Sequence, residues 1–318
     1  MPSLTRLLLL ITISVSISIL SACGVVTDYA RDNELDLPII GQSFESPVRL
    51  RVGIIPFEDQ ALLGSSEAGT NMARLVGLEF KDNPNLLVVD PEDVRKYVEG
   101  RGITFPITPE QAMQIGRDLN LNVVMEGAIS HVGEHQQRTG WRKLFRWFTD
   151  KSQFVDGILL IRAYDPSDGT VITSRSSESN IRVGAAAEPD FDGTLEEFKP
   201  NQEEIEASLD DALDNIYYRS LDGLRALPFK AMVKSADEAN SKVTIGYGAN
   251  VGIRKGMRFV LLSYPETITS DFVGYTYYIP GPPIAHLRVE SVTDKSATLK
   301  VNDGTVALGD MIQTFKRH

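Results

Sequence analysis

The chain has 318 residues and only one cysteine, Cys23, so it can form no internal disulfide. It also lacks a broad excess of basic residues, because its formal net charge is −11 at pH 7, and nucleic acid is therefore not an expected partner. Its apolar stretch at residues 7–20 is rich in serine and shorter than the roughly 20 apolar residues of a transmembrane helix. With 42% hydrophobic and 24% charged residues, the composition excludes a disordered chain and a membrane protein with several spans.

The N-terminal residues follow the pattern of a secretory signal, with Arg6, then the apolar residues 7–20, then small side chains. The run Leu20-Ser21-Ala22-Cys23 matches the bacterial lipobox, which implies cleavage before Cys23 and attachment of a diacylglycerol to its sulfur. The only thiol of the sequence therefore stands where lipidation requires one. We expect residues 1–22 to be a lipoprotein signal peptide, and the alternative is an uncleaved anchor with an incidental cysteine.

The mature chain is expected to be held at a membrane by its lipid. Gly24 rather than an aspartate follows Cys23, and the resemblance to sorted lipoproteins then implies the outer membrane, with the protein facing the periplasm. Several acyl chains, palmitate among them, make a stable anchor. Residues 23–47 are polar, contain Pro38 and Gly41 and show no clear period, so we expect a lipidated tether between the anchor and the fold.

Residues 48–227 alternate between strand patterns and helix patterns. Their first ten residues pass from alternation into a solid apolar run, which is typical of a strand buried on both faces. Further strands are expected at residues 86–89, 122–132, 157–164 and 170–177, and helices after Asp90, after Thr108 and over residues 203–227. This order predicts an α/β (α+β) fold in which helices pack on a mixed sheet.

Residues 229–318 have a different character, because helical periodicity is absent from them. Strand patterns at residues 242–245, 257–263, 284–292 and 297–301 are separated by turns rich in Gly, Pro, Asn and Asp. Several short strands with such turns predict a small all-β domain, either a barrel or a sandwich. We place the domain boundary near residues 227–229.

Several of these residues carry a resemblance to known families. Ile54-Ile55-Pro56-Phe57, residues 121–127 and the run Asp165-Pro166-Ser167-Asp168-Gly169-Thr170-Val171 resemble the CsgG superfamily, over residues 48–227. The resemblance implies the anticodon-binding-like α/β domain that CsgG shares with the TolB N-terminal domain and LpoB. Residues 250–259, 285–292 and 306–311 resemble the C-terminal β-domain of the flagellar assembly protein FlgT, over residues 229–318. Members of these families are envelope scaffolds or channels and not enzymes.

One motif of the sequence resembles a metal-binding pattern. The run His131-Val132-Gly133-Glu134-His135 matches H-x-x-E-H, which needs both histidines on one face of a helix. Here it continues a predicted strand, where positions i and i+4 lie about 13 Å apart, too far for one metal with bonds of about 2 Å. No Gly-x-Ser-x-Gly occurs, and the one cysteine is assigned to the lipid. We expect no enzymatic activity, no metal site and no cofactor.

Both tryptophans of the sequence lie in a predicted insertion at residues 133–156. Trp141, Leu144, Phe145 and Phe148 fall at i, i+3, i+4 and i+7, which places them on one face of a helix. A basic amphipathic helix of this kind contacts a membrane interface or a partner protein, and the alternative is that it packs on its own domain. The expected contact residues are Trp141, Arg142, Lys143, Leu144, Phe145, Arg146, Trp147 and Phe148.

The excess negative charge is concentrated in one stretch. Residues 188–214 hold eleven carboxylates against a single basic residue, Lys199. We expect a flexible loop that leads into the closing helix. Electrostatic docking of a basic partner is the alternative.

Together these features predict a non-enzymatic outer-membrane lipoprotein that serves as a periplasmic assembly or scaffold component of an envelope machine, flagellar or similar. The expected partners are the membrane, through the lipid anchor, and envelope proteins, with a homo-oligomeric ring implied by the family resemblance. Two alternatives are a subunit of a curli-type secretion channel and an LpoB-like activator of a peptidoglycan synthase. The channel is disfavoured because neither alternate set of residues 141–148 is cleanly apolar, as a membrane hairpin requires.

Overall fold

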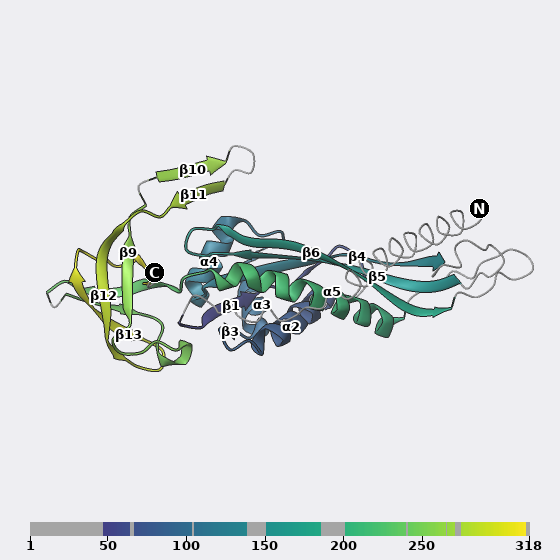
Figure 1. Cartoon of the computed structure of the whole chain (residues 1–318), viewed down its shortest axis with the longest axis horizontal. Coiled ribbons are helices and arrows are strands. Elements are labelled where there is room, and N and C mark those ends of the chain that lie inside the picture. Colours follow the sequence, from purple (N-terminus) through teal and green to yellow (C-terminus); the bar gives the residue numbers. More distant parts are fainter. Residues whose placement is uncertain are drawn as a thin grey trace, which may run out of the picture. The chain divides into compact units, whose positions relative to one another are not determined.

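The structure is a computed structural model of the chain (Figure 1). It describes residues 47–63, 67–103, 105–138, 151–185, 201–239, 241–264, 266–270 and 275–315. All of these belong to one compact unit, residues 44–318. Within those ranges, every helix is too short or too polar to cross a lipid bilayer.

The first part of this unit is a mixed sheet with the strand order β3-β1-β4-β5-β6, in which β2 pairs beside β4. Strand β1 is parallel to β3 and β4, whereas β4, β5 and β6 are successively antiparallel. The strands are β1 (Leu50–Ile54), β2 (Glu58–Asp59), β3 (Leu86–Val88), β4 (Val123–Arg138), β5 (Lys151–Tyr164) and β6 (Val171–Ala185). Ile54 enters one hydrophobic cluster and Ile55 the other, which confirms the strand buried on both faces.

Four helices pack on this sheet: α2 (Ala68–Lys81), α3 (Pro91–Gly100), α4 (Pro109–Leu119) and α5 (Gln202–Arg225). The two N-caps expected from the sequence are confirmed. Asp90 accepts a hydrogen bond from the backbone N–H of Glu92, and Thr108 forms a reciprocal capping box with Gln111. Asn201 and Glu204 form a second capping box at the start of α5.

The helices form a layer on each face of the sheet. Helices α2 and α5 contribute Phe80 and Ile216 to the larger hydrophobic cluster, which includes Met125 of β4. Helices α3 and α4 contribute Val94 and Ile115 to a smaller cluster on the opposite face. Helix α5 runs along β5 and β6 (Figure 1), so one face of these long strands is covered along much of its length.

The second part is a closed barrel of six antiparallel strands in the order β12-β13-β8-β7-β14-β9. Its strands are β7 (Lys230–Asp237), β8 (Lys242–Ile245), β9 (Arg258–Leu262), β12 (Pro283–Val292), β13 (Ala297–Asp303) and β14 (Met311–Thr314), with a 3₁₀ turn η2 (Ala249–Val251). A separate hairpin of β10 (Glu266–Ser270) and β11 (Tyr275–Ile279) connects β9 to β12 (Figure 1).

The predicted fold class is confirmed: helices pack on a mixed sheet, and an all-β barrel follows. Two differences concern length. Strands β4 and β5 continue through residues 133–138 and 151–156, so the sheet runs into both ends of the predicted insertion. Strand β6 likewise extends to Ala185, well past the expected residue 177. The residues in these extensions are polar at alternate positions, so no apolar run marks them as strands in the sequence. Pairing with β5 holds β6 in the extended conformation there.

Candidate functional site

The fold begins where the sheet and the barrel meet. The backbone N–H of Arg49 donates to the carbonyl of Val251 over 2.8 Å, and its guanidinium donates to the carbonyl of Asn250. The next residue, Leu50, opens β1 and donates to the carbonyl of Asn85. Val48 and Leu50 are buried in the hydrophobic cluster that also contains the core of the barrel. The residues that follow the predicted tether are therefore fixed to both parts of the fold.

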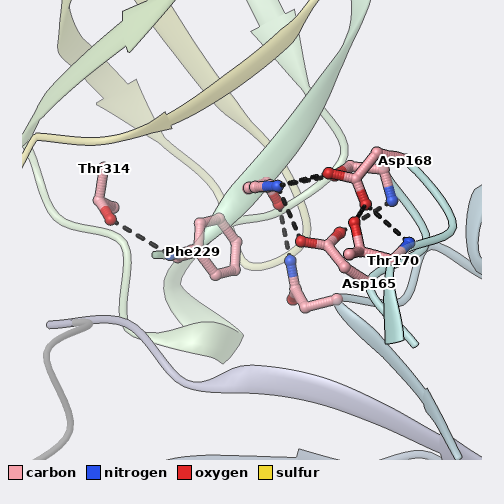
Figure 2. Close-up of polar contacts among 8 residues, drawn as sticks. Asp165, Asp168, Thr170, Phe229 and Thr314 are labelled. Atoms are coloured by element: carbon pink, nitrogen blue, oxygen red, sulfur yellow. Dashed lines mark hydrogen bonds and ion pairs between the residues drawn. The ribbon is translucent and has the colours of Figure 1, made fainter. Parts of the chain in front are cut away.

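A buried ion pair joins the two parts (Figure 2). Lys230 opens the barrel strand β7, and its Nζ lies 2.7 Å from Oδ2 of Asp165, which follows β5. The same ammonium donates to the hydroxyl of Ser167 over 2.8 Å and lies 3.7 Å from Oδ2 of Asp168. The side chains of Lys230 and Asp165 are only 16% and 10% exposed. One lysine of the barrel is thus held by three polar groups of the sheet domain.

The turn between β5 and β6 is built to present these groups. Asp165 accepts a hydrogen bond from the backbone N–H of Ser167, and its carbonyl accepts one from the N–H of Gly169. Gly169 has a φ of +78°, in the left-handed region that favours glycine. Asp168 in turn accepts from the N–H of Thr170. These local bonds direct both carboxylates toward β7, as Figure 2 shows.

The electrostatics keep Lys230 charged. Burial by itself would lower the pKa of this lysine, but the nearby charges of Asp165 and Asp168 outweigh burial and raise the pKa above its ordinary value of 10.5. The ammonium is therefore protonated across the physiological range. A fixed ion pair of this kind positions the two parts relative to each other.

Two asparagines add further links across the junction. Asn122, which is 7% exposed, accepts a hydrogen bond from the backbone N–H of Arg51 and donates to the carbonyl of Lys230 over 2.7 Å. Asn120 ends α4 in the left-handed conformation and donates to the carbonyl of Gly246 over 2.7 Å. The gap that these groups border holds only about 30 Å³, the space of one or two waters.

A second polar cluster lies on the sheet face that carries α3 and α4. The buried carboxylate of Glu126 accepts hydrogen bonds from the hydroxyl of Tyr164 over 2.7 Å and from the backbone N–H of Ile107 over 2.9 Å. The guanidinium of Arg162 lies 3.3 Å away. Burial, aided by the charge of Glu126, raises the pKa of Tyr164, so its hydroxyl stays protonated and donates. This cluster holds the loop before α4 against the sheet.

The opposite face carries an apolar groove between α2 and the first turns of α5. It has a volume of about 490 Å³. Its apolar lining includes Met72 and Leu75 of α2, Ile129 of β4, and Ile205 and Leu209 of α5. A volume of this size accommodates several side chains of a binding partner.

The rim of this groove is acidic. Glu203, Glu206 and Asp210, all on α5, border it, and Arg74 of α2 is the cation among the bordering side chains. The partial positive charge at the start of α5, about half an elementary charge, offsets only part of three carboxylates. The groove therefore combines an apolar interior with a net negative edge. We call it the α2–α5 groove.

The predicted contact residues lie outside this description. Cys23, the segment from Trp141 to Phe148 with its predicted helix, and residues 188–200 of the acidic stretch are all beyond the described residues. Of the H-x-x-E-H motif, His131 and Glu134 are exposed on β4, which confirms that the motif lies on a strand. In the part of the chain that the structure describes, no group of three or more His, Cys, Asp or Glu side chains could hold a metal ion.

The sequence carries little signal for the junction or the groove. The run from Asp165 to Thr170 resembles a family pattern, and its two aspartates, with a proline and a glycine, also indicate a turn that exposes two carboxylates. The signal from Lys230 is weaker, because it is one lysine at the start of an alternating strand. The groove has no local signal, since its lining comes from three elements far apart in the sequence.

The fold and its junction define a mixed-sheet α/β protein joined to a closed six-stranded barrel. No protein-family model matches the chain, and no curated protein matches it either. Among solved structures, it resembles the lipoprotein GNA1162 from Neisseria meningitidis at 9% identity, over 53% of this chain and 99% of that one, with a TM-score of 0.33. The PelC dodecamer from Paraburkholderia phytofirmans aligns at 10% identity over 57% and 91% of the two chains, with a TM-score of 0.31.

The LpoB C-terminal domain from Escherichia coli aligns at 11% identity, over 45% of this chain and 85% of that one, with a TM-score of 0.28.

Proposed function

We propose that this chain is a non-enzymatic outer-membrane lipoprotein that acts as a scaffold on the periplasmic side of the envelope, in a flagellar or similar assembly. In this proposal Cys23 carries the lipid, residues 23–47 form the tether, and the folded unit presents its surfaces to protein partners. The resemblance of residues 48–227 to the CsgG superfamily and of residues 229–318 to the FlgT β-domain supports the choice of assembly.

The observation that carries the proposal is the way the chain enters its fold. Arg49 binds the barrel at Val251 and Asn250, and Leu50 starts a strand that lies between β3 and β4. A pull on the tether is thus resisted by hydrogen bonds of both parts, and Lys230 holds these parts together through Asp165. A scaffold needs this property, because its binding surfaces must keep a fixed relation to the anchor.

The anchor is tested by comparing the full chain with its Cys23→Ser variant in a Gram-negative host that is fed a labelled palmitate. The proposal expects labelled protein in the outer-membrane fraction for the natural sequence. It expects unlabelled, uncleaved or soluble protein for Cys23→Ser, because the thioether cannot form. Equal labelling of both proteins would contradict the assignment of Cys23.

The scaffold role is tested by photo-crosslinking in living cells from positions 141 and 147, with position 178 on β6 as the control site. The proposal expects crosslinks from positions 141 and 147 to defined envelope proteins or to other copies of the chain. A detergent-embedded ring with a central pore would instead favour the curli-type channel. Recovery of a peptidoglycan synthase that the purified chain stimulates would favour the LpoB-like activator.

A further inference from the structure

The α2–α5 groove lies in a wider region of negative charge. Burial raises the pKa of Glu79 on α2, and the carboxylates of Asp214, Asp210 and Asp82 raise it further. Burial likewise raises the pKa of Asp211, and the charge of Asp210 raises it further. Carboxylates that disfavour one another's ionisation attract cations, so the groove selects a partner that is apolar in the centre and basic at its edges.

The chain itself contains a segment of this chemistry. Trp141, Leu144, Phe145 and Phe148 recur at helical spacing, and Arg142 and Arg146 lie off that stripe. An amphipathic helix that places its apolar face in a hydrophobic groove is a common mode of peptide recognition. Its basic residues would then face the carboxylates of the rim.

The covalent structure limits which copy of the segment reaches the groove. The segment belongs to the twelve residues, 139–150, that join Arg138 of β4 to its partner Lys151 of β5. Ile129, in the groove lining, is nine residues from Arg138 along β4, about 30 Å at the usual rise of a strand. A connection fixed at both ends extends only half its length, about 20 Å when fully stretched, and less when helical. Its own copy of the segment can therefore reach the near end of the groove, where Leu209 lies beside Gly157 of β5, but it cannot fill the groove as far as Ile129.

We propose that the α2–α5 groove binds the aromatic-basic segment, residues 141–148, of a second copy of this chain. The inference rests on the proposed scaffold function and adds its partner. Because the groove and the segment are different surfaces, two copies can exchange segments and close a dimer, or the contact can repeat head to tail into a closed ring or an open filament.

The test uses the full lipidated chain in detergent and measures its mass by sedimentation over a range of concentrations. One variant reverses the rim, Glu206→Lys with Asp210→Lys, and another reverses the segment, Arg142→Glu with Arg146→Glu. The matched control is Glu178→Lys with Glu238→Lys, which makes the same change of charge at exposed positions outside the groove lining. We expect the first two variants to self-associate roughly tenfold more weakly or worse, and the control to associate as the natural chain does.

Mixing the rim variant with the segment variant distinguishes the groove–segment contact from other contacts between copies. In an equal mixture the natural segment of one variant meets the natural groove of the other, and the reversed segment meets the reversed groove, so the two variants should assemble with each other although neither assembles alone. A chain with both reversals should regain self-association, since the charges are again complementary. A monomeric natural chain, or rim and segment variants that assemble as well as the control, would overturn the proposal.

The fold of each variant is checked by its circular dichroism and urea midpoint, so that loss of assembly is not confused with unfolding. The lipid is read from the mass of the same samples. A lipidated chain that stays monomeric overturns the second-copy inference and leaves the scaffold function intact. A chain without lipid at Cys23 contradicts the anchor, whatever its state of assembly.

Discussion

Lys230 and Asp165 are 65 residues apart in the sequence, and their side chains meet at 2.7 Å in the structure. The contact joins the first strand of the barrel to the turn that follows β5. Because both side chains are largely withdrawn from water, the pair must remain complete to be tolerated. The junction therefore depends on each member being present.

Removal of one member should destabilise the protein strongly. We expect Asp165→Ala to lower the free energy of unfolding by about 3–5 kcal/mol, because a buried ammonium loses its closest carboxylate. Urea denaturation followed by circular dichroism measures the change. As a control, Lys230→Met combined with Asp165→Ala should cost less than the sum of the single changes, since no uncompensated lysine is left. Additive losses would show that the pair is not coupled.

The same pair predicts a loss of stability in alkali. The pKa of Lys230 is raised in the folded state, so above its ordinary value of 10.5 the unfolded chain releases this proton first. The folded state then binds more protons, and the free energy of unfolding falls as the pH rises through the folded pKa. Below 10.5 the contribution is fully present.

Urea midpoints measured at increasing alkaline pH should therefore fall less steeply for Lys230→Met than for the natural chain. A part of the slope should persist in the variant, because burial raises the pKa of Tyr247 and that group titrates in both proteins. Identical slopes in the two proteins would refute the assignment to Lys230.

Asn120 serves the junction in two separable ways, through its left-handed backbone and through its side chain. Asn120→Gly keeps the conformation, with φ +57°, but loses the hydrogen bond to Gly246, and we expect a loss of about 1 kcal/mol. Asn120→Ala also places a Cβ in the left-handed region, which adds about 1–2 kcal/mol. Thermal unfolding of both variants should rank them in this order. Equal losses would assign the whole effect to the hydrogen bond.

The acidic region near the groove should carry a measurable repulsion. The pKa of Glu79 is raised, so its ionisation in the folded state costs stability at neutral pH, and that cost disappears as the pH falls below its ordinary value of 4.5. We expect Glu79→Gln to raise the melting temperature slightly at pH 7, by the equivalent of about 0.5 kcal/mol or less. Added salt should shrink the gain. A gain that is independent of salt would assign the raised pKa to burial of Glu79, its largest cause, rather than to repulsion by the neighbouring carboxylates.

Local signals in the sequence predicted much of the fold. Asp90-Pro91 and the capping box of Thr108 and Gln111 define helix starts within a few residues, since each cap satisfies backbone groups of its own helix. The alternation at residues 242–245 and 284–292 likewise marked barrel strands. Strands β7 and β14 were missed, because short segments next to a helix end or a turn carry little periodicity of their own.

Taken by itself, the sequence determined most of the elements and the change from α/β to all-β, and it predicts a lipid at Cys23 and a contact segment from Trp141 to Phe148. Only the tertiary structure decided that Lys230 meets Asp165 and that Glu206 and Asp210 border an apolar groove with Ile129. The physical reason is the range of the interactions. Caps and periodicity act within a turn or a strand, whereas ion pairs and grooves arise from side chains that packing brings together across the chain.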